Sequence, residues 1–178
     1  MNAGVVLGVD PGLSVSGFGV MRIVERKVQL IECGALKLPA KESIPRRIGL
    51  FYDFFSGKVR EHGVSMLVLE TPFLGKNAQN FLKLGYLRGV LSLIVEQHAL
   101  QLGEFAPREV KALVTGYGHA DKDQVARVMH RFFPTLATQR YQDTTDAVAI
   151  TLCGAWKLQI DSALAGARER ASRSQGVL

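Results

Sequence analysis

The chain is 178 residues long, which is typical of a single domain, and 47% of its residues are hydrophobic, enough to bury a core. Its net charge of +6 and its isoelectric point of ≈ 9.5 favour a polyanionic partner such as a nucleic acid, although a ribosomal or membrane-surface role would also suit a basic chain. A membrane span is excluded, because the most apolar stretch, 81–95, contains Lys83 and Arg88.

Apolar patterns and turn signals predict an α/β fold with a five-stranded mixed sheet flanked by helices. The first three strands are expected to pair antiparallel, because short turns join them. The fourth and fifth strands follow helical crossovers and can run parallel to the first. We expect five strands, at 4–10, 16–24, 27–36, 64–70 and 104–106. We expect helices at 44–62, at about 77–102, at 107–115 and at 143–160. One further helix should begin at a cap, either Asp121 or Asp123, and end at 133.

Cysteine and histidine usage argues against a disulfide framework and against zinc. The two cysteines, Cys33 and Cys153, lie far apart in apolar segments, which is typical of reduced core thiols in a cytoplasmic protein. The four histidines form no cluster with ligand spacing.

Four carboxylates stand where a predicted strand stops or a predicted helix begins. Asp10 closes the first strand, Glu70 closes the fourth, and Asp143 and Asp146 open the last helix. Each has a purely structural explanation, as a turn former, a strand end or a helix cap. The functional interpretation is favoured because all four fit one edge of the predicted sheet, and because residues three apart share a helix face.

An all-carboxylate set without histidine suits Mg²⁺, which prefers oxygen ligands, and Mn²⁺ is its expected substitute. Two such ions about 4 Å apart can generate a hydroxide and stabilise the leaving oxygen in phosphodiester hydrolysis. On a basic chain, this predicts metal-assisted cutting of a polyanion. No serine or cysteine nucleophile site is recognisable, and the spaced glycines Gly8 and Gly12 are not a P-loop, since no Gly-Lys-Ser/Thr follows.

Ordered sequence blocks that together span roughly residues 5–157 resemble the RuvC family of bacterial Holliday junction resolvases. The blocks are Leu7-Gly-Val-Asp-Pro-Gly12 with Gly17-Phe-Gly-Val20, Glu70-Thr-Pro-Phe-Leu-Gly-Lys-Asn77, Pro107-Arg-Glu-Val-Lys111, Gly116-Tyr-Gly-His-Ala-Asp-Lys-Asp-Gln-Val125 and Asp143-Thr-Thr-Asp-Ala147. The resemblance implies an RNase H-like fold and a Mg²⁺-dependent homodimer. It implies paired nicks in the two opposed strands of a four-way DNA junction, in recombination and repair, with RuvA and RuvB as partner proteins.

Carried over residue by residue, the resemblance makes Asp10, Glu70, Asp143 and Asp146 the metal ligands. It places two lysines near the scissile phosphate and one aromatic side chain against a base at the junction centre. These are Lys111, Lys122 and Phe73, and the weaker candidates for DNA contact are Lys76, Arg88, Arg108 and His119. We expect the nuclease domain to cover 1–160 and a basic tail to cover 161–178, either disordered or holding DNA loosely.

Three other functions compete with junction resolution. An RNase H-like protein of the YqgF type would act on RNA, but it would be shorter and would lack the block at 70–77. A non-catalytic junction-binding or scaffold protein would have lost an acid, and none is missing. An actin-like ATPase domain would need a second phosphate loop and a longer chain.

Overall fold

The computed structural model describes residues 4–72, 78–138 and 141–175, and its five strands form one mixed sheet in the order β3-β2-β1-β4-β5. Strands β1, β2 and β3 pair antiparallel, whereas β4 and β5 run parallel to β1, as predicted. The strands are β1 (Val5–Asp10), β2 (Val15–Val24), β3 (Lys27–Lys37), β4 (Met66–Glu70) and β5 (Gln101–Phe105).

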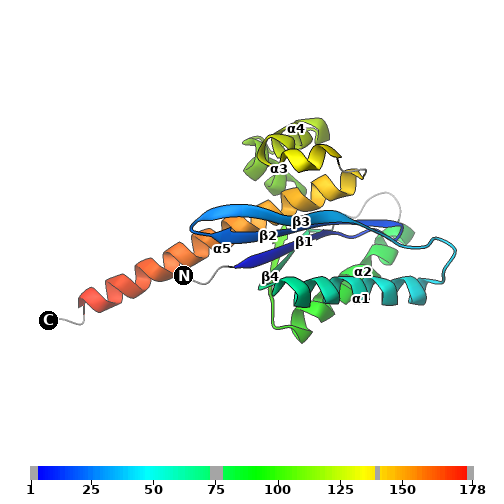
Figure 1. Ribbon diagram of the computed structural model, residues 1–178, viewed down its shortest axis with the longest axis horizontal. Coiled ribbons are helices and arrows are strands. Elements are labelled where there is room, and N and C mark those ends of the chain that lie inside the picture. The colour runs from blue at the N-terminus through cyan, green and yellow to red at the C-terminus, as the bar shows by residue number, and fades with distance from the viewer. Residues whose placement is uncertain (1–3, 73–77, 139–140, 176–178) are drawn as a thin grey trace.

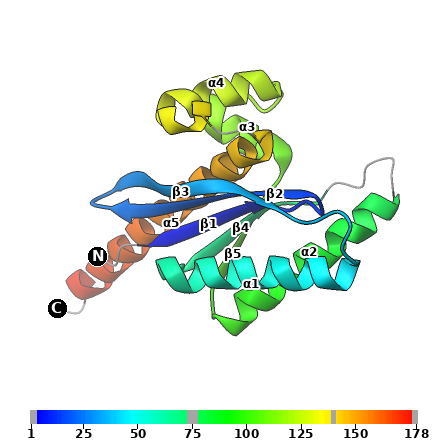
Figure 2. The same ribbon diagram turned by 45° about the vertical axis from the view of Figure 1, so that its right-hand side comes forward.

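Helices cover both faces of this sheet (Figures 1 and 2). Helices α1 (Ile44–His62) and α2 (Ala78–Gln97) pack on one face, and α5 (Gln142–Gln175) crosses the other. Helices α3 (Pro107–Thr115) and α4 (Lys122–Phe132) form an outer layer on the α5 side, followed by a short 3-10 helix, η1 (Pro134–Thr138). The sheet therefore separates two hydrophobic cores, because alternate strand residues point to opposite faces.

The main differences from the predicted elements lie at the end of α2, in the loop after α4 and at the end of α5. Helix α2 ends at Gln97 rather than near 102, so β5 begins at Gln101. The predicted polar loop at 134–142 contains η1. Helix α5 continues to Gln175, well past the predicted end at 160, and projects beyond the sheet in Figure 1. In the part of the chain that the structure describes, no helix is long and apolar enough to cross a membrane.

Candidate active site

Two of the four predicted acids lie at the ends of adjacent parallel strands. Strands β1 and β4 pair with Val9 opposite Leu69, so Asp10 and Glu70, each the next residue, leave the sheet side by side. Both strands are buried up to their last residue, where both acids become half-buried. A strand pair of this kind brings two carboxylates from distant parts of the chain to one edge, as the sequence predicted.

Helix α5 reaches the same edge because glycines let it approach the sheet closely. A Cβ on Gly17 would overlap the carbonyl oxygen of Asp143, and one on Gly8 would overlap the hydroxyl of Thr151. Thr151 Oγ1 donates to the carbonyl of Ala147 at 2.6 Å, which keeps this small polar group satisfied inside the helix. The first turn of α5 is thereby held against β1 and β2. Since α5 begins at Gln142, Asp143 lies within that turn rather than at its cap.

The four carboxylates are close enough to act on one another electrostatically. Burial, followed by the charges of Asp146, Asp143 and Glu70, raises the pKa of Asp10 from 3.8 to about 7. Burial and the charge of Asp146 also raise the pKa of Glu70. Buried, mutually repelling carboxylates of this kind are typical of functional sites, and a bound cation would relieve both the burial penalty and the repulsion.

The two predicted lysines supply part of that charge. Lys122, the first residue of α4, donates from Nζ to Asp146 Oδ2 at 3.1 Å, and the charge of Asp146 raises the pKa of its ammonium group. Lys111, on α3, opposes the rise in the pKa of Glu70, as Lys122 also does. Both lysines therefore lie beside the carboxylates, and they come from two different helices.

A cleft of ≈ 400 Å³ adjoins the acids and is lined by Asp10, Glu70 and side chains of α2, including Arg88. The guanidinium of Arg88 donates to the backbone carbonyl of Glu70 at 2.7 Å and pairs with the Glu104 carboxylate on β5. Arg88 therefore ties α2 to the end of β4. The sequence predicted a DNA contact for this residue; its hold on Glu70 and the role of Glu104 were missed, because no sequence motif marks them.

The remaining predicted DNA contacts lie on the α3 side or beyond the described residues. Arg108 and His119 are exposed, and the His119 ring lies 5.7 Å from that of Tyr117. Phe73 and Lys76 fall in the segment 73–77, outside the described residues, so their contacts with DNA stay predictions.

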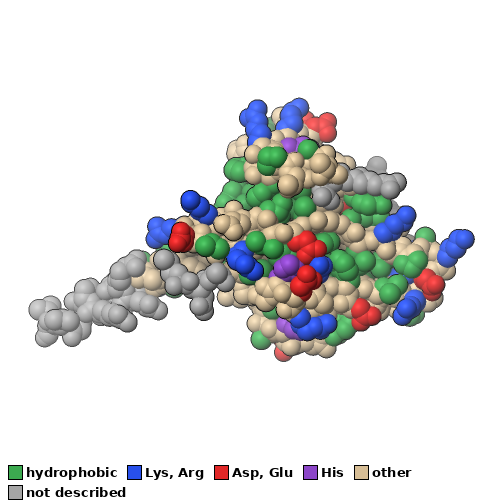
Figure 3. Space-filling model, viewed as in Figure 1, with side chains coloured by type: hydrophobic (Ala, Val, Ile, Leu, Met, Phe, Trp, Pro, Cys, Tyr) green, Lys and Arg blue, Asp and Glu red, His purple; other side chains and the backbone are tan. Residues whose placement is uncertain are grey.

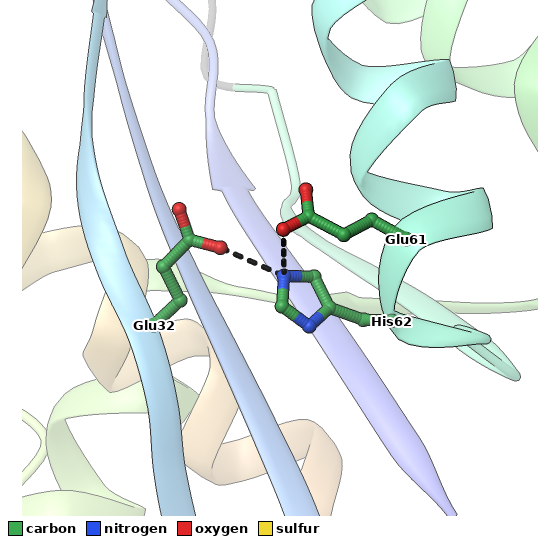
Figure 4. A group of neighbouring side chains, drawn as sticks. All are labelled: Glu32, Glu61 and His62. Carbon is green, nitrogen blue, oxygen red and sulfur yellow. Dashed lines mark hydrogen bonds and ion pairs between the residues drawn. The ribbon is translucent and has the colours of Figure 1, made fainter.

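A second group of potential metal ligands lies away from this edge (Figure 4). Among the described residues, the ligand atoms of Glu32 on β3 and of Glu61 and His62 on α1 lie within 4.8 Å of one another. Lys58 already occupies this group, with its Nζ 2.7 Å from Glu32 and 2.9 Å from Glu61.

The side chains of Lys58 and His62 therefore stabilise Glu32 inside this second group. Burial disfavours the ionised form of Glu32, but the hydrogen bonds from Lys58 and His62 outweigh it and hold the pKa of Glu32 below its ordinary value. Figure 3 shows acidic, basic and histidine side chains close together near the middle of this face, and Figure 4 shows Glu32, Glu61 and His62 pointing toward one another. The arrangement is that of an ion-pair network joining α1 to the edge strand β3, and no sequence motif predicted it.

Comparison with known proteins points to one family. The model of the family "Crossover junction endodeoxyribonuclease RuvC" matches residues 6–154. The chain is 39% identical over 149 residues to the RuvC of Prosthecochloris aestuarii, covering 84% of this chain and 80% of that protein. It is 34% identical over 146 residues to the RuvC of Rickettsia bellii, covering 82% of this chain and 93% of that protein.

Solved structures show the same fold. The structure of Thermus thermophilus RuvC superposes with a TM-score of 0.79 at 23% identity, covering 88% of this chain and 96% of that one. The structure of the same protein in complex with a Holliday junction substrate superposes with a TM-score of 0.77 at 20% identity, again covering 88% of this chain and 96% of that one. The five-stranded mixed sheet flanked by helices is the RNase H-like fold that the sequence predicted.

Proposed function

We propose that this chain, which belongs to the crossover junction endodeoxyribonuclease RuvC family, resolves four-way DNA junctions by paired nicks in opposed strands, in recombination and DNA repair in the cytoplasm. The observation that carries the proposal is the gathering of Asp10, Glu70 and Asp146 at one sheet edge with Lys122 paired to the last of them. The RNA-acting alternative receives no comparable support, because the family match extends over residues 6–154.

The carboxylates fit a hard divalent cation. The four candidate ligands at the edge are all carboxylates, and burial together with their mutual repulsion raises the pKa values of Asp10 and Glu70, which supports a site that binds cations. We assign Asp10, Glu70, Asp143 and Asp146 as the residues that would hold Mg²⁺, with Mn²⁺ as a substitute. When bound in a pair, such ions would supply an activated water and stabilise the leaving oxygen.

The chain's own side chains position the substrate and stabilise charge. In the proposal, Lys111 and Lys122 face the scissile phosphate, which gains negative charge during attack. The hydrogen bond from Arg88 to the backbone carbonyl of Glu70 fixes the end of β4, which helps to orient the Glu70 carboxylate toward the site. Phe73 would stack on an unpaired base at the junction centre, where branched DNA offers one.

The functional unit in this proposal is a homodimer, with RuvA and RuvB as further partners. Two active sites related by a two-fold axis match two opposed strands of a symmetric junction. The exposed apolar side of α2, which includes Leu82 and Tyr86, supports an interface between two copies of the chain.

A cleavage assay tests the proposal. The protein is incubated with Mg²⁺ and a synthetic four-way junction, with a linear duplex and an RNA–DNA hybrid in parallel. We expect symmetric nicks in two opposed strands of the junction and none in the other substrates. Cutting of the hybrid without the junction would contradict the proposal and favour the RNA-acting alternative.

Variants of the acids then test the site. Asp143→Asn and Asp146→Asn should nearly abolish cutting while the junction still binds, and the loss of negative charge should tighten binding. Loss of binding together with loss of folding would instead identify these two acids as structural residues of the first turns of α5.

A further inference from the structure

The outer layer of α3 and α4 contains a hollow that the proposed active site does not use. Its volume is ≈ 280 Å³, and Thr115, Tyr117, Gln124, Arg127 and Arg131 are among the residues that line it. Arg127 and Arg131 are four apart on α4, so they project from one face of the helix. Tyr117 beside them keeps 59% of its surface exposed. Figure 3 shows basic side chains at the outer end of this layer.

The two arginines are free to take an anion. Within the described ranges, neither forms an ion pair or a hydrogen bond, whereas Arg88 is held by Glu104 and by the Glu70 carbonyl. A guanidinium without a carboxylate partner keeps all its donors available for a phosphate. Beside such a pair, the hydroxyl of Tyr117 and the amide of Gln124 can hydrogen-bond phosphate or sugar oxygens.

The position of the hollow relates it to the proposed cleavage site. Helix α4 begins with Lys122, whose ammonium contacts Asp146. At 1.5 Å per residue, Arg127 and Arg131 lie roughly 7 and 13 Å farther along the helix axis. Along a junction arm that runs parallel to α4, a DNA strand advances about 3.4 Å per nucleotide, so these distances would correspond to roughly two to four nucleotides.

We infer that the hollow, which we call the α3–α4 groove, binds the sugar–phosphate backbone of a junction arm about two to four nucleotides from the scissile phosphate, through Arg127 and Arg131. This inference rests on the proposed function and adds a contact outside its active site. The groove sets the register of the arm and takes no part in the chemistry. Charge complementarity selects DNA as the occupant, because the groove offers two unpaired cations on a chain of net charge +6.

Salt-dependent binding provides the first test. Arg127→Gln with Arg131→Gln should weaken junction binding and lower the slope of log affinity against log salt by roughly two, because each lost phosphate contact removes about 0.9 from it. The single-turnover cleavage rate at saturating junction should stay unchanged. Arg127→Lys with Arg131→Lys should keep the slope, and it controls for folding defects.

Arg22→Gln is the matched control. Arg22 is exposed and pairs with Val5 at the opposite end of β1 from Asp10, so its loss should leave the slope unchanged. An unchanged slope in the double Arg→Gln variant would overturn the inference, and so would a slope that falls equally in the control. Capture of an acidic protein by the groove, with junction binding intact in the double variant, would also overturn it.

A chemically altered junction locates the contact. Neutral methylphosphonates placed two to four nucleotides from the cut should weaken binding of the wild-type protein but not of the double Arg→Gln variant. Equal weakening of both proteins would place the arm elsewhere and overturn the inference. If the wild-type protein fails to cut the junction at all, the proposed function fails; if it cuts and the variants bind like wild type, only the groove assignment fails.

Discussion

At the scale of single residues, Asp10 shows that the candidate site is built at the expense of stability. Its pKa lies near 7 in the folded protein and near 3.8 in the unfolded chain. Between these values the folded protein binds more protons than the unfolded chain, so stability falls as the pH rises from about 4 to 7. Above pH 7 the full penalty applies, and it is on the order of a few kcal/mol because one pKa unit corresponds to about 1.4 kcal/mol.

We therefore predict that Asp10→Asn stabilises the metal-free protein while it abolishes cutting. The gain in the free energy of unfolding should be roughly 2–4 kcal/mol at pH 8 and should shrink toward zero as the pH approaches 4. Urea unfolding in the presence of a chelator, at pH 8, 6 and 4.5, measures it. Adding Mg²⁺ should raise the melting temperature of the wild-type protein more than that of the variant. A variant less stable than wild type at pH 8 would mean that Asp10 is a structural turn residue.

The two lysines beside the acids differ in their contacts. Lys122 is ion-paired with Asp146, whereas Lys111 acts on Glu70 without a hydrogen bond to it. We predict that Lys122→Ala lowers the single-turnover cleavage rate at saturating junction and Mg²⁺ by about tenfold or more, because a positioned cation stabilises charge in the transition state. Lys111→Ala should have a smaller effect on the same rate. If both rates matched wild type, the lysines would be ordinary solvated cations.

At the scale of secondary-structure elements, the placement of Asp143 depends on how closely α5 lies on the sheet. We predict that Gly17→Ala destabilises the protein by about 3 kcal/mol or more and strongly reduces cutting, because the new methyl group would overlap the Asp143 carbonyl and push the first turn of α5 outward. Gly57→Ala in α1 is the matched control. A Cβ there meets nothing within 4 Å, so this substitution should stabilise the helix by about 0.5–1 kcal/mol. Thermal melts and junction cleavage of the two variants give the comparison, and equal behaviour would contradict it.

Helix ends show what the sequence could and could not reveal. Helices α1 and α2 both end with a residue in the left-handed conformation. In α1 the backbone N–H of Val64 then donates to the carbonyl of Val59, and in α2 that of Leu100 donates to the carbonyl of Val95. In α1 the left-handed residue is Gly63, which a sequence reader recognises as a helix stop. In α2 it is Ala99, which carries no such signal, so the predicted helix ran on into β5.

The C-terminal half of α5 was missed for a related reason. The segment after residue 160 contains alanine, arginine and glutamate, which favour helix, but it has no apolar stripe facing a core. At 1.5 Å per residue the 34-residue helix is about 50 Å long, well beyond the width of the sheet that it crosses. Where packing does not select the structure, periodicity cannot predict it.

The candidate site was predictable to the extent that strand ends and helix starts could be read. Asp10 and Glu70 close buried strands, and the predicted topology allowed those strands to lie side by side, which the pairing of β1 with β4 confirms. The hold of Arg88 on Glu70 joins elements that are distant in sequence and follows no fixed spacing. The ion-pair network around Glu32 depends on the same kind of tertiary contact. Only the folded chain reveals such pairs.

At the scale of the whole molecule, α2 has an exposed face that the chain's own packing leaves unexplained. Leu82, Tyr86 and Leu93 are 64%, 53% and 49% exposed, and with Gly89 they follow a 4-3-4 spacing along one side of the helix. A Cβ on Gly85 or Gly89 would meet nothing within 4 Å. Glycines lower the stability of a helix, and these two make no close contact within the described chain. A second backbone packed against them would explain both the glycines and the exposed apolar side chains.

We predict that Leu82→Glu with Leu93→Glu converts a dimer into a folded monomer, because two charges would be buried across a two-fold interface. Sedimentation velocity at micromolar concentration should give the mass of two chains for the wild-type protein and of one chain for the variant. Leu113→Glu on α3 is the control, since this leucine is similarly exposed at 45% but lies outside α2, and it should remain dimeric. The monomer should also lose paired nicking, because a single active site reaches only one of the two opposed strands. A wild-type protein that sediments as a monomer would remove the interface from the proposed mechanism.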